Sequence, residues 1–212
     1  MRVALLVLFL LLAACGSQTS APSWTLERIA ALTPEQIDAL SEGELQEIQG
    51  VLQPEFARVE RELAQLQSQL EGLSGITAQE ARWPNFDYTV YLATAIPYTT
   101  FFARYYRAYS GPDWSNNGCS YSPDKPLLLN FKDPCNHHDF GYRNVPQYAR
   151  GRSETYRKYV DDRFLSNLKS VCGDLPWWDP RKDQCYVLAY TYYAAVRNLG
   201  KGAYYSTPQR YP

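Results

Sequence analysis

The sequence lacks an excess of charge of either sign, and several residue types are scarce. Its 212 residues include one Met, two His and five Cys, and 21 Lys and Arg face 22 Asp and Glu. This balance gives no basis for broad nucleic-acid binding. Hydrophobic residues make up 45% and aromatic residues 15% of the chain, which excludes a disordered or collagen-like protein. Alternating strand patterns are also absent, so we expect an all-α fold.

Residues 1–14 have the features of an export signal. Arg2 precedes an apolar run of about a dozen residues, fewer than the ~20 that a membrane-spanning helix needs. The segment Leu12–Cys15 resembles the lipobox of bacterial lipoproteins, in which the cysteine is acylated and becomes the mature N-terminus. The alternative is an ordinary signal peptide whose cleavage leaves Cys15 as a free thiol. We expect the lipidated form, anchored to the cell envelope through a polar tether over residues 15–24, or a secreted protein.

Residues 25–82 have helical periodicity and form a predicted N-terminal extension. Thr33–Pro34 is typical of a helix start, and Ser41 with Glu44 has the spacing of a capping box. A longer helix over 54–73 is predicted to begin at a proline. It carries one apolar seam: Phe56, Val59, Leu63, Leu66, Leu70 and Leu73. The seam either packs on the next domain, which we favour, or forms a coiled-coil dimer; the oligomeric state stays open.

Residues 83–212 form a second predicted domain, rich in aromatics, that contains both histidines and the other four cysteines. Such a length can bury a core of its own, and two disulfides would reinforce it. The pattern predicts helices over 95–109, 134–143, 153–172 and about 184–199, with loops over 110–132 and 173–183 and a stop at Gly200.

The segment that contains both histidines carries the clearest chemical pattern. At 100° per residue, Cys135 projects between His138 and Asp139 on the predicted helix. If Cys135 pairs with Cys119, the polar turn 116–118 is pulled beside the carboxylate of Asp139. Side-chain and backbone oxygens of that kind suit calcium.

Asp161 is the acidic residue of a stripe that is otherwise apolar, followed by Leu165, Leu168 and Cys172. A carboxylate in such a position needs a partner. A histidine on an antiparallel helix is the natural one, because the pair fixes the imidazole tautomer and makes the other ring nitrogen a better base. The alternative is that Asp161 lies at the edge of the stripe and is solvated like Asp162.

The segment from Cys135 to Asn144, CNHHDFGYRN, closely resembles the Cys-x-Arg-His-Asp-Phe-Gly-Tyr signature of the small secreted phospholipase A2 enzymes of bacteria and fungi. The resemblance covers roughly residues 95–199. Further positions match in family order: Asp113-Trp114-Ser115, Cys119, Pro123–Pro126, Val160-Asp161, Phe164, Lys169, Val171-Cys172 and Thr191–Val196.

The resemblance implies a phospholipase A2-like helical domain with two antiparallel catalytic helices. It implies that His138 is the general base, Asp161 its orienting carboxylate and Asp139 a calcium ligand. A water deprotonated by the histidine would attack the sn-2 ester, while calcium binds the phosphate and stabilises the oxyanion. No Gly-x-Ser-x-Gly elbow is present to supply a serine nucleophile, in agreement with this chemistry.

The implied disulfides are Cys119–Cys135 and Cys172–Cys185. Two positions depart from the family pattern. Asn117 stands where the family has its second calcium carboxylate, before Gly118, whose backbone oxygen would be the next ligand. One negative charge fewer predicts a weak calcium site.

His137 replaces the arginine of the motif, which leaves a zinc site as a minor alternative; it would need both adjacent imidazoles or recruited carboxylates. Trp177 and Trp178 fit either the bilayer interface or the core. We therefore expect a calcium-dependent phospholipase A2 that acts on a phospholipid membrane. The competing interpretation is a non-catalytic envelope lipoprotein that keeps the scaffold with a weakened calcium site.

Overall fold

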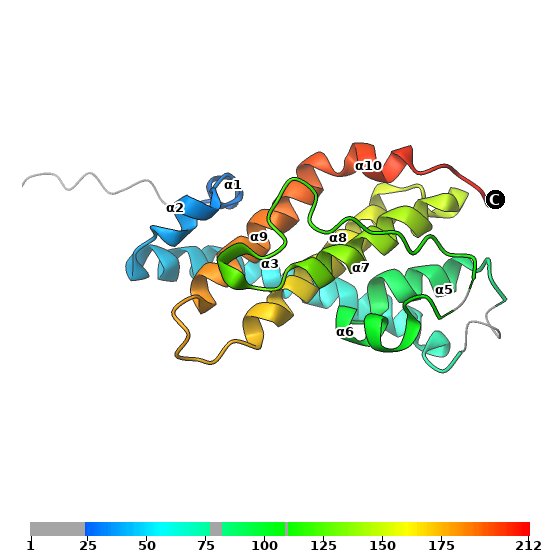
Figure 1. The fold of residues 1–212 in the computed structure, drawn as a ribbon, viewed down its shortest axis with the longest axis horizontal. Coiled ribbons are helices and arrows are strands. Elements are labelled where there is room, and N and C mark those ends of the chain that lie inside the picture. Colours follow the sequence, from blue (N-terminus) through cyan, green and yellow to red (C-terminus); the bar gives the residue numbers. More distant parts are fainter. Residues whose placement is uncertain (1–23, 77–81, 109) are drawn as a thin grey trace, which may run out of the picture.

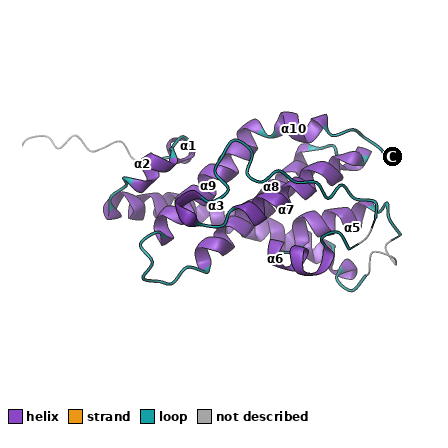
Figure 2. Cartoon of the chain, in the orientation of Figure 1, coloured by secondary structure: helices purple, strands orange, loops and turns teal. Residues whose placement is uncertain are grey.

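A computed structural model describes residues 24–76, 82–108 and 110–212. The predicted signal peptide, Cys15 and all but one residue of the tether lie outside these ranges. The described residues are helical, joined by loops, and the isolated Tyr148–Tyr211 bridge is the β-type pairing among them (Figure 2). The all-α prediction is therefore confirmed. None of the described helices combines the length and the apolar character needed to cross a bilayer.

The helices follow in chain order, with short 3-10 or π segments between them (Figure 1). The α-helices are α1 (Leu26–Ala30), α2 (Pro34–Asp38), α3 (Glu42–Gln69), α5 (Phe86–Val90), α6 (Tyr98–Thr100), α7 (Lys132–Asn144), α8 (Glu154–Gly173), α9 (Lys182–Leu199) and α10 (Lys201–Ser206). The short segments are η1 (Glu71–Leu73), η2 (Tyr91–Ala95), η3 (Phe101–Tyr105), η4 (Pro126–Leu128), η5 (Val145–Gln147) and η6 (Ala149–Gly151).

Helices α7 and α8 lie side by side and run in opposite directions, and α9 packs against α8 (Figure 1). A glycine allows the close approach of α7 to α8. A Cβ atom at Gly141 would lie 2.5 Å from Cγ1 of Val160, so a side chain at this position would push the helices apart. Val160 directly precedes Asp161, and Gly141 lies one turn after His138. The close contact therefore sets the spacing at which the two candidate catalytic residues face each other.

The extension packs within the chain. The capping boxes Thr33–Gln36 and Ser41–Glu44 start α2 and α3. The seam of α3 is buried against α8 and α9, which cross it in Figure 1. Its buried residues are Leu45, Ile48, Leu52, Phe56, Val59, Leu63 and Leu66. All but Leu66 belong to a core that also contains Leu165, Leu168 and Leu188, so the extension and the second half of the chain share one core.

Charged residues of α3 also reach α8. Asp162 is fully buried and accepts hydrogen bonds from Lys158 at 2.6 Å and from the Tyr193 hydroxyl at 2.9 Å. Lys158 is also bonded to Glu62 of α3, and the Arg58 guanidinium lies 4.0 Å from Asp162. Asp162 is therefore not solvated, and its ion cluster joins the extension to the helix that carries Asp161.

Two helix boundaries differ from the prediction. The long helix begins at Glu42 and continues through Pro54, because the capping box at Ser41 starts it and the buried seam extends on both sides of the proline. The helix predicted over 95–109 is shorter and spans Tyr98 to Tyr105. Pro97 separates it from an earlier helical run, from Phe86 to Ala95, because proline cannot continue that helix. The carbonyls of Thr94 and Ala95, freed at this break, accept hydrogen bonds from the buried guanidinium of Arg163, at 2.5 and 3.3 Å.

The disulfides Cys119–Cys135 and Cys172–Cys185 are both formed, as predicted. The first joins the long loop after η3 to α7, and the second closes the loop between α8 and α9. Helix α9 ends before Gly200, as expected. Helix α10, which follows immediately, is not among the helices expected from the sequence.

Candidate functional site

His138 and Asp161 face each other across the α7–α8 contact. Nε2 of His138 lies 2.8 Å from Oδ1 of Asp161, which is fully buried, and His138 is 9% exposed. Because a carboxylate only accepts, Nε2 carries the proton and Nδ1 is left with a lone pair. The rings of Tyr142 and Phe164 contact the imidazole with centroids 4.1 and 4.7 Å away and restrict its rotation.

Three further side chains donate to Asp161. The Tyr142 hydroxyl bonds Oδ1 at 2.8 Å, while Oδ2 accepts from Arg157 at 3.2 Å and from Arg197 at 2.7 Å. Both oxygens of the buried carboxylate are thus satisfied, and two guanidinium groups offset its charge. The alternative of a solvated Asp161 is wrong. Sequence reasoning had assigned no role to these three donors; Arg157 could have been found from its i,i+4 spacing, whereas no local pattern pointed to Arg197.

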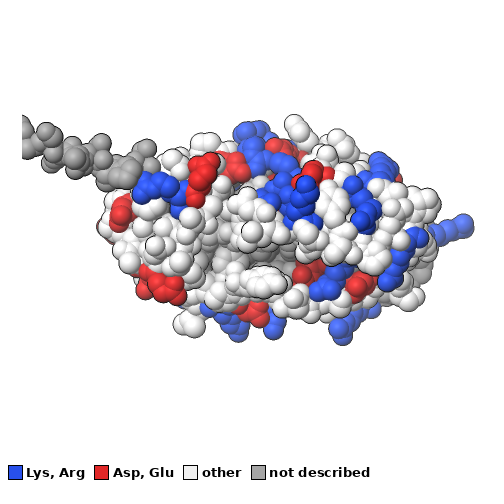
Figure 3. Space-filling model, turned by 90° about the horizontal axis from the view of Figure 1, so that it is seen from above, with Lys and Arg blue, Asp and Glu red and all other residues white. Residues whose placement is uncertain are grey.

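A cavity of about 260 Å³ opens beside His138. Its wall is largely apolar, and its floor holds the imidazole and the Asp139 carboxylate. The lining residues are Gly118–Ser122, Cys135, His138, Asp139, Tyr142, Phe164, Tyr192, Ala195, Val196, Leu199, Gly200 and Ala203. Seen from above, the molecule has a central hollow with a largely uncharged border, and acidic and basic side chains are interspersed elsewhere on this face (Figure 3). Such a cavity suits a ligand with long apolar parts and one polar reacting group.

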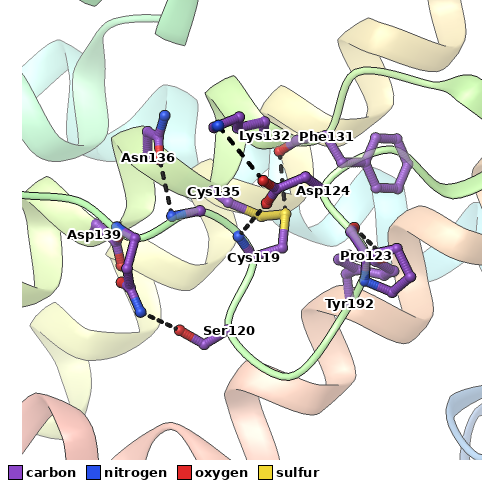
Figure 4. The surroundings of a disulfide bond; sticks show 12 residues. Cys119, Ser120, Pro123, Asp124, Phe131, Lys132, Cys135, Asn136, Asp139 and Tyr192 are labelled. Carbon is purple, nitrogen blue, oxygen red and sulfur yellow. Dashed lines mark hydrogen bonds and ion pairs between the residues drawn. A yellow bond between two sulfur atoms is a disulfide. The ribbon is translucent and has the colours of Figure 1, made fainter.

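The disulfide Cys119–Cys135 places the loop over 115–120 beside Asp139 (Figure 4). The backbone N–H of Asn117 donates to Oδ2 of Asp139 at 2.8 Å, and the N–H of Gly118 donates to Asn136 at 3.1 Å. Gly118 has a φ of +73°, and a Cβ atom there would lie 2.4 Å from Asp124. Glycine is therefore required at this turn, where the chain passes close to Asp124.

The carboxylate of Asp139 fits a cation. Within the described part of the chain its Oδ1 accepts no hydrogen bond, and it lines the cavity. Burial raises the pKa of Asp139 above its ordinary value, although the Asn117 N–H acts in the opposite direction. A calcium ion would offset the cost of burying this charge.

The other oxygen atoms near Asp139 fit a calcium ion only weakly. The side-chain oxygen of Asn117 accepts from Arg143 at 3.0 Å, and its amide nitrogen donates to Ser120 at 3.0 Å. The described ranges contain no cluster of three or more His, Cys, Asp or Glu side chains suited to a metal. Besides Asp139, a calcium ion would rely on backbone oxygens such as that of Gly118, on water and on the amide of Asn117.

His137 is a core residue with both ring nitrogens bonded. Nε2 donates to the carbonyl of Leu92 at 2.8 Å, and Nδ1 accepts from the Asn167 amide at 2.9 Å. Burial lowers the pKa of His137 to about 3, so the ring is neutral at physiological pH. Neither nitrogen is free for zinc, and the zinc alternative that used both imidazoles is wrong.

Trp177 and Trp178 are exposed, at 88% and 67%, so the core alternative is wrong for both. Their loop is held to the neighbouring one by Arg181, which donates to the carbonyl of Leu127 at 3.1 Å. The large hydrophobic residues that are exposed in the described ranges are Tyr121, Leu128, Trp177, Trp178 and Leu199. Tyr121 and Leu199 line the cavity mouth, and the other three lie on the two loops joined by Arg181.

Comparison with known proteins gives a family match over the part of the chain that contains His138, Asp139 and Asp161. A family model described as prokaryotic phospholipase A2 matches residues 87–200. A secretory phospholipase A2 of Arthroderma benhamiae is 42% identical over 91 residues, which are 42% of this chain and 61% of that protein. A secretory phospholipase A2 of Beauveria bassiana is 32% identical over 124 residues, 57% of this chain and 62% of that protein. The chain thus spans about three fifths of the length of these curated relatives.

Proposed function

Because the chain belongs to the prokaryotic phospholipase A2 family, we propose that it hydrolyses the sn-2 ester of glycerophospholipids in a calcium-dependent reaction. The observation that carries the proposal is the buried His138–Asp161 pair beside a largely apolar cavity. The largely apolar cavity wall suits an acyl chain, and the imidazole of His138 lines the same cavity.

In the proposed mechanism, Asp161 holds the Nε2–H of His138 and leaves Nδ1 as the base. Nδ1 takes a proton from a water whose oxygen attacks the sn-2 carbonyl. The tetrahedral intermediate then expels the lysophospholipid oxygen, which receives that proton from Nδ1. The fatty acid and the lysophospholipid leave, and no bond to the protein is formed at any step.

Calcium held at Asp139, when bound, would supply positive charge for the lipid phosphate and for the developing oxyanion. The chain's own contribution is to orient that carboxylate, through the Asn117 N–H and the disulfide-linked loop.

The test is release of fatty acid from phospholipids labelled at sn-1 or at sn-2, in mixed micelles, with calcium or a chelator. We expect release from the sn-2 label alone, only with calcium, and a loss of at least about 100-fold in His138→Gln. Asp133→Asn, which changes a carboxylate elsewhere on α7, serves as the matched control and should keep the rate. No release at millimolar calcium would contradict the proposal and favour the non-catalytic lipoprotein, which the Asn117–Arg143 contact makes the second candidate.

We also propose that the protein is exported and anchored through acylated Cys15, and that its partner is a phospholipid membrane. The lipobox-like segment Leu12–Cys15 supports the anchor, and the exposed Trp177, Trp178 and Leu128 support membrane contact. Mass spectrometry of the mature N-terminus tests the anchor, since an unmodified Cys15 would remove it.

A further inference from the structure

Two arginines from different parts of the fold donate hydrogen bonds to Asp161, on the side of the carboxylate away from His138. Arg157 lies one turn before it on α8, whereas Arg197 comes from the last turn of α9. Both donate to the same oxygen, Oδ2, at 3.2 and 2.7 Å. The other oxygen, Oδ1, accepts from His138 and Tyr142. With all four donors in place, the plane of the carboxylate is fixed.

The arginines belong to a closed ion cluster. Glu154 pairs with Arg157 at 2.9 Å and approaches Arg197 at 3.7 Å. Two carboxylates thus face two guanidinium groups, and the cluster is neutral as a whole. Arg157 is further held by the carbonyls of Val196 and Arg197, each at 3.2 Å, so it also fastens the end of α9 to α8.

Arg197 differs from Arg157 in its surroundings. The Arg157 side chain is 4% exposed, whereas the Arg197 side chain is 24% exposed. A second cavity, of about 270 Å³, lies between α1, α3 and α9, and Arg197 is part of its wall. The guanidinium of Arg197 is held by its contact with Oδ2 of Asp161 at 2.7 Å and lies farther, at 3.7 Å, from Glu154. The residue can also be replaced without overpacking.

We propose that Arg197 is a positioning residue for the hydrolysis: by holding Oδ2 of Asp161, it keeps Oδ1 directed at Nε2 of His138. This inference rests on the proposed function for its kinetic part, but not for its structural part. Without Arg197 the carboxylate can turn towards Arg157 alone, and the imidazole loses its fixed orientation. A misplacement of about 1 Å at a reacting group can cost on the order of 100-fold in rate.

The test compares Arg197→Met with Glu154→Gln in the full chain. Both variants remove an ion pair from the same cluster, but only the first removes a donor to Asp161. With a short-chain phospholipid below its micelle concentration, we expect Arg197→Met to lower kcat at least about 10-fold with little change in KM. Glu154→Gln should stay close to the wild-type kcat. Arg197→Lys keeps the positive charge but lacks the planar guanidinium group, so its kcat should lie between those of the other two variants.

The second readout needs no activity. The chain contains only two histidines, so NMR of protein with 15N-labelled histidine gives few signals, and His138→Gln assigns them. We expect the Nε2–H of His138 to be observed and protected in the wild type and in Glu154→Gln, and to exchange faster with water in Arg197→Met. A purely structural ion pair would lower the melting temperature of both variants without this difference.

If Arg197→Met lowers kcat no more than Glu154→Gln and the His138 signal is unchanged, the proposal is wrong. If the wild type releases no fatty acid, the proposed function fails, and the NMR comparison alone decides about Arg197. If Arg197→Met does not fold, Arg197→Lys takes its place, and wild-type kcat together with wild-type exchange of the His138 Nε2–H in that variant would overturn the proposal.

Discussion

The side-chain oxygen of Asn117 accepts a hydrogen bond from the guanidinium of Arg143 at 3.0 Å. A calcium ion bound beside Asp139 would therefore compete with an arginine for this oxygen and would gain no negative charge from it. This contact gives a structural reason for the weak calcium site that the sequence predicts.

Asn117→Asp adds a carboxylate next to Asp139 and should tighten calcium binding by about tenfold, which corresponds to roughly 1.4 kcal/mol. Isothermal titration calorimetry measures the change. Asn116→Asp is the control, because it adds the same charge one residue away, where the native amide bonds the Tyr106 hydroxyl. Equal affinities in the two variants would mean that only the net charge matters and that position 117 is no ligand.

Replacing Trp177 and Trp178 by serine should weaken binding to phospholipid vesicles, because both side chains are exposed and indoles favour the bilayer interface. Vesicle co-sedimentation measures binding. Hydrolysis of a short-chain, dispersed phospholipid should stay unchanged, since neither residue lines the cavity beside His138. The comparison Tyr159→Ser changes a partly buried aromatic residue on α8. Equal loss of vesicle binding in that variant would argue against a specific contact by the tryptophan loop.

His137→Phe keeps an aromatic ring against Phe101 but removes the partners of the Leu92 carbonyl and the Asn167 amide. We expect a loss of about 1–3 kcal/mol in the free energy of unfolding, because buried polar groups are left unpaired. Urea denaturation measures it. In combination with Asn167→Leu the two losses should not add, and strict additivity would show that the His137–Asn167 bond contributes nothing.

Pro54→Ala should stabilise the protein. Pro54 is exposed and lies in the interior of α3. Proline there costs about 3 kcal/mol relative to alanine, and its restriction of the unfolded chain offsets up to about 1 kcal/mol of that cost. A gain of about 2 kcal/mol in urea denaturation is expected. Gln53→Ala, at the exposed neighbouring position, should change the stability little. No gain in Pro54→Ala would mean that α3 has adapted its geometry to the proline.

Asp179 should titrate at unusually low pH. Hydrogen bonds from the Arg181 side chain and backbone hold the pKa of its carboxyl at about 2, below the ordinary 3.8. Since the folded pKa lies below the unfolded one, the pair stabilises the tryptophan loop fully above pH 3.8 and loses this effect as the pH falls towards 2. NMR of the carboxyl carbon checks the value. In Arg181→Gln it should return towards 3.8, and an unchanged titration would rule out the arginine as the cause.

Local patterns in the sequence were sufficient for much of the helical structure. The Ser41–Glu44 capping box, the apolar stripe that contains Asp161 and the glycine after α9 each depend on neighbouring residues alone. The disulfide pairing needed the family resemblance, because four cysteines admit three pairings.

What the sequence could not predict depends on contacts between distant residues. Pro54 looked like a helix start because its effect on a helix is local, whereas the seam that keeps α3 continuous is buried by α8 and α9. Arg197 lies 36 residues after Asp161 and becomes its partner only through the packing of α9 on α8. The exposure of Trp177 likewise depends on how the loop closed by Cys172–Cys185 packs against the rest of the protein, which the local sequence does not specify.

The core shared by α3, α8 and α9 has a practical consequence for anyone who shortens this protein. A fragment that begins at residue 83 would lack α3, so apolar side chains of α8 and α9 would be exposed to water. Asp162 would also lose the nearby Arg58. This exposed apolar surface would make the fragment prone to aggregation. Low yield or poor solubility of a truncated preparation would then reflect the missing helix rather than a defect in the residues around His138.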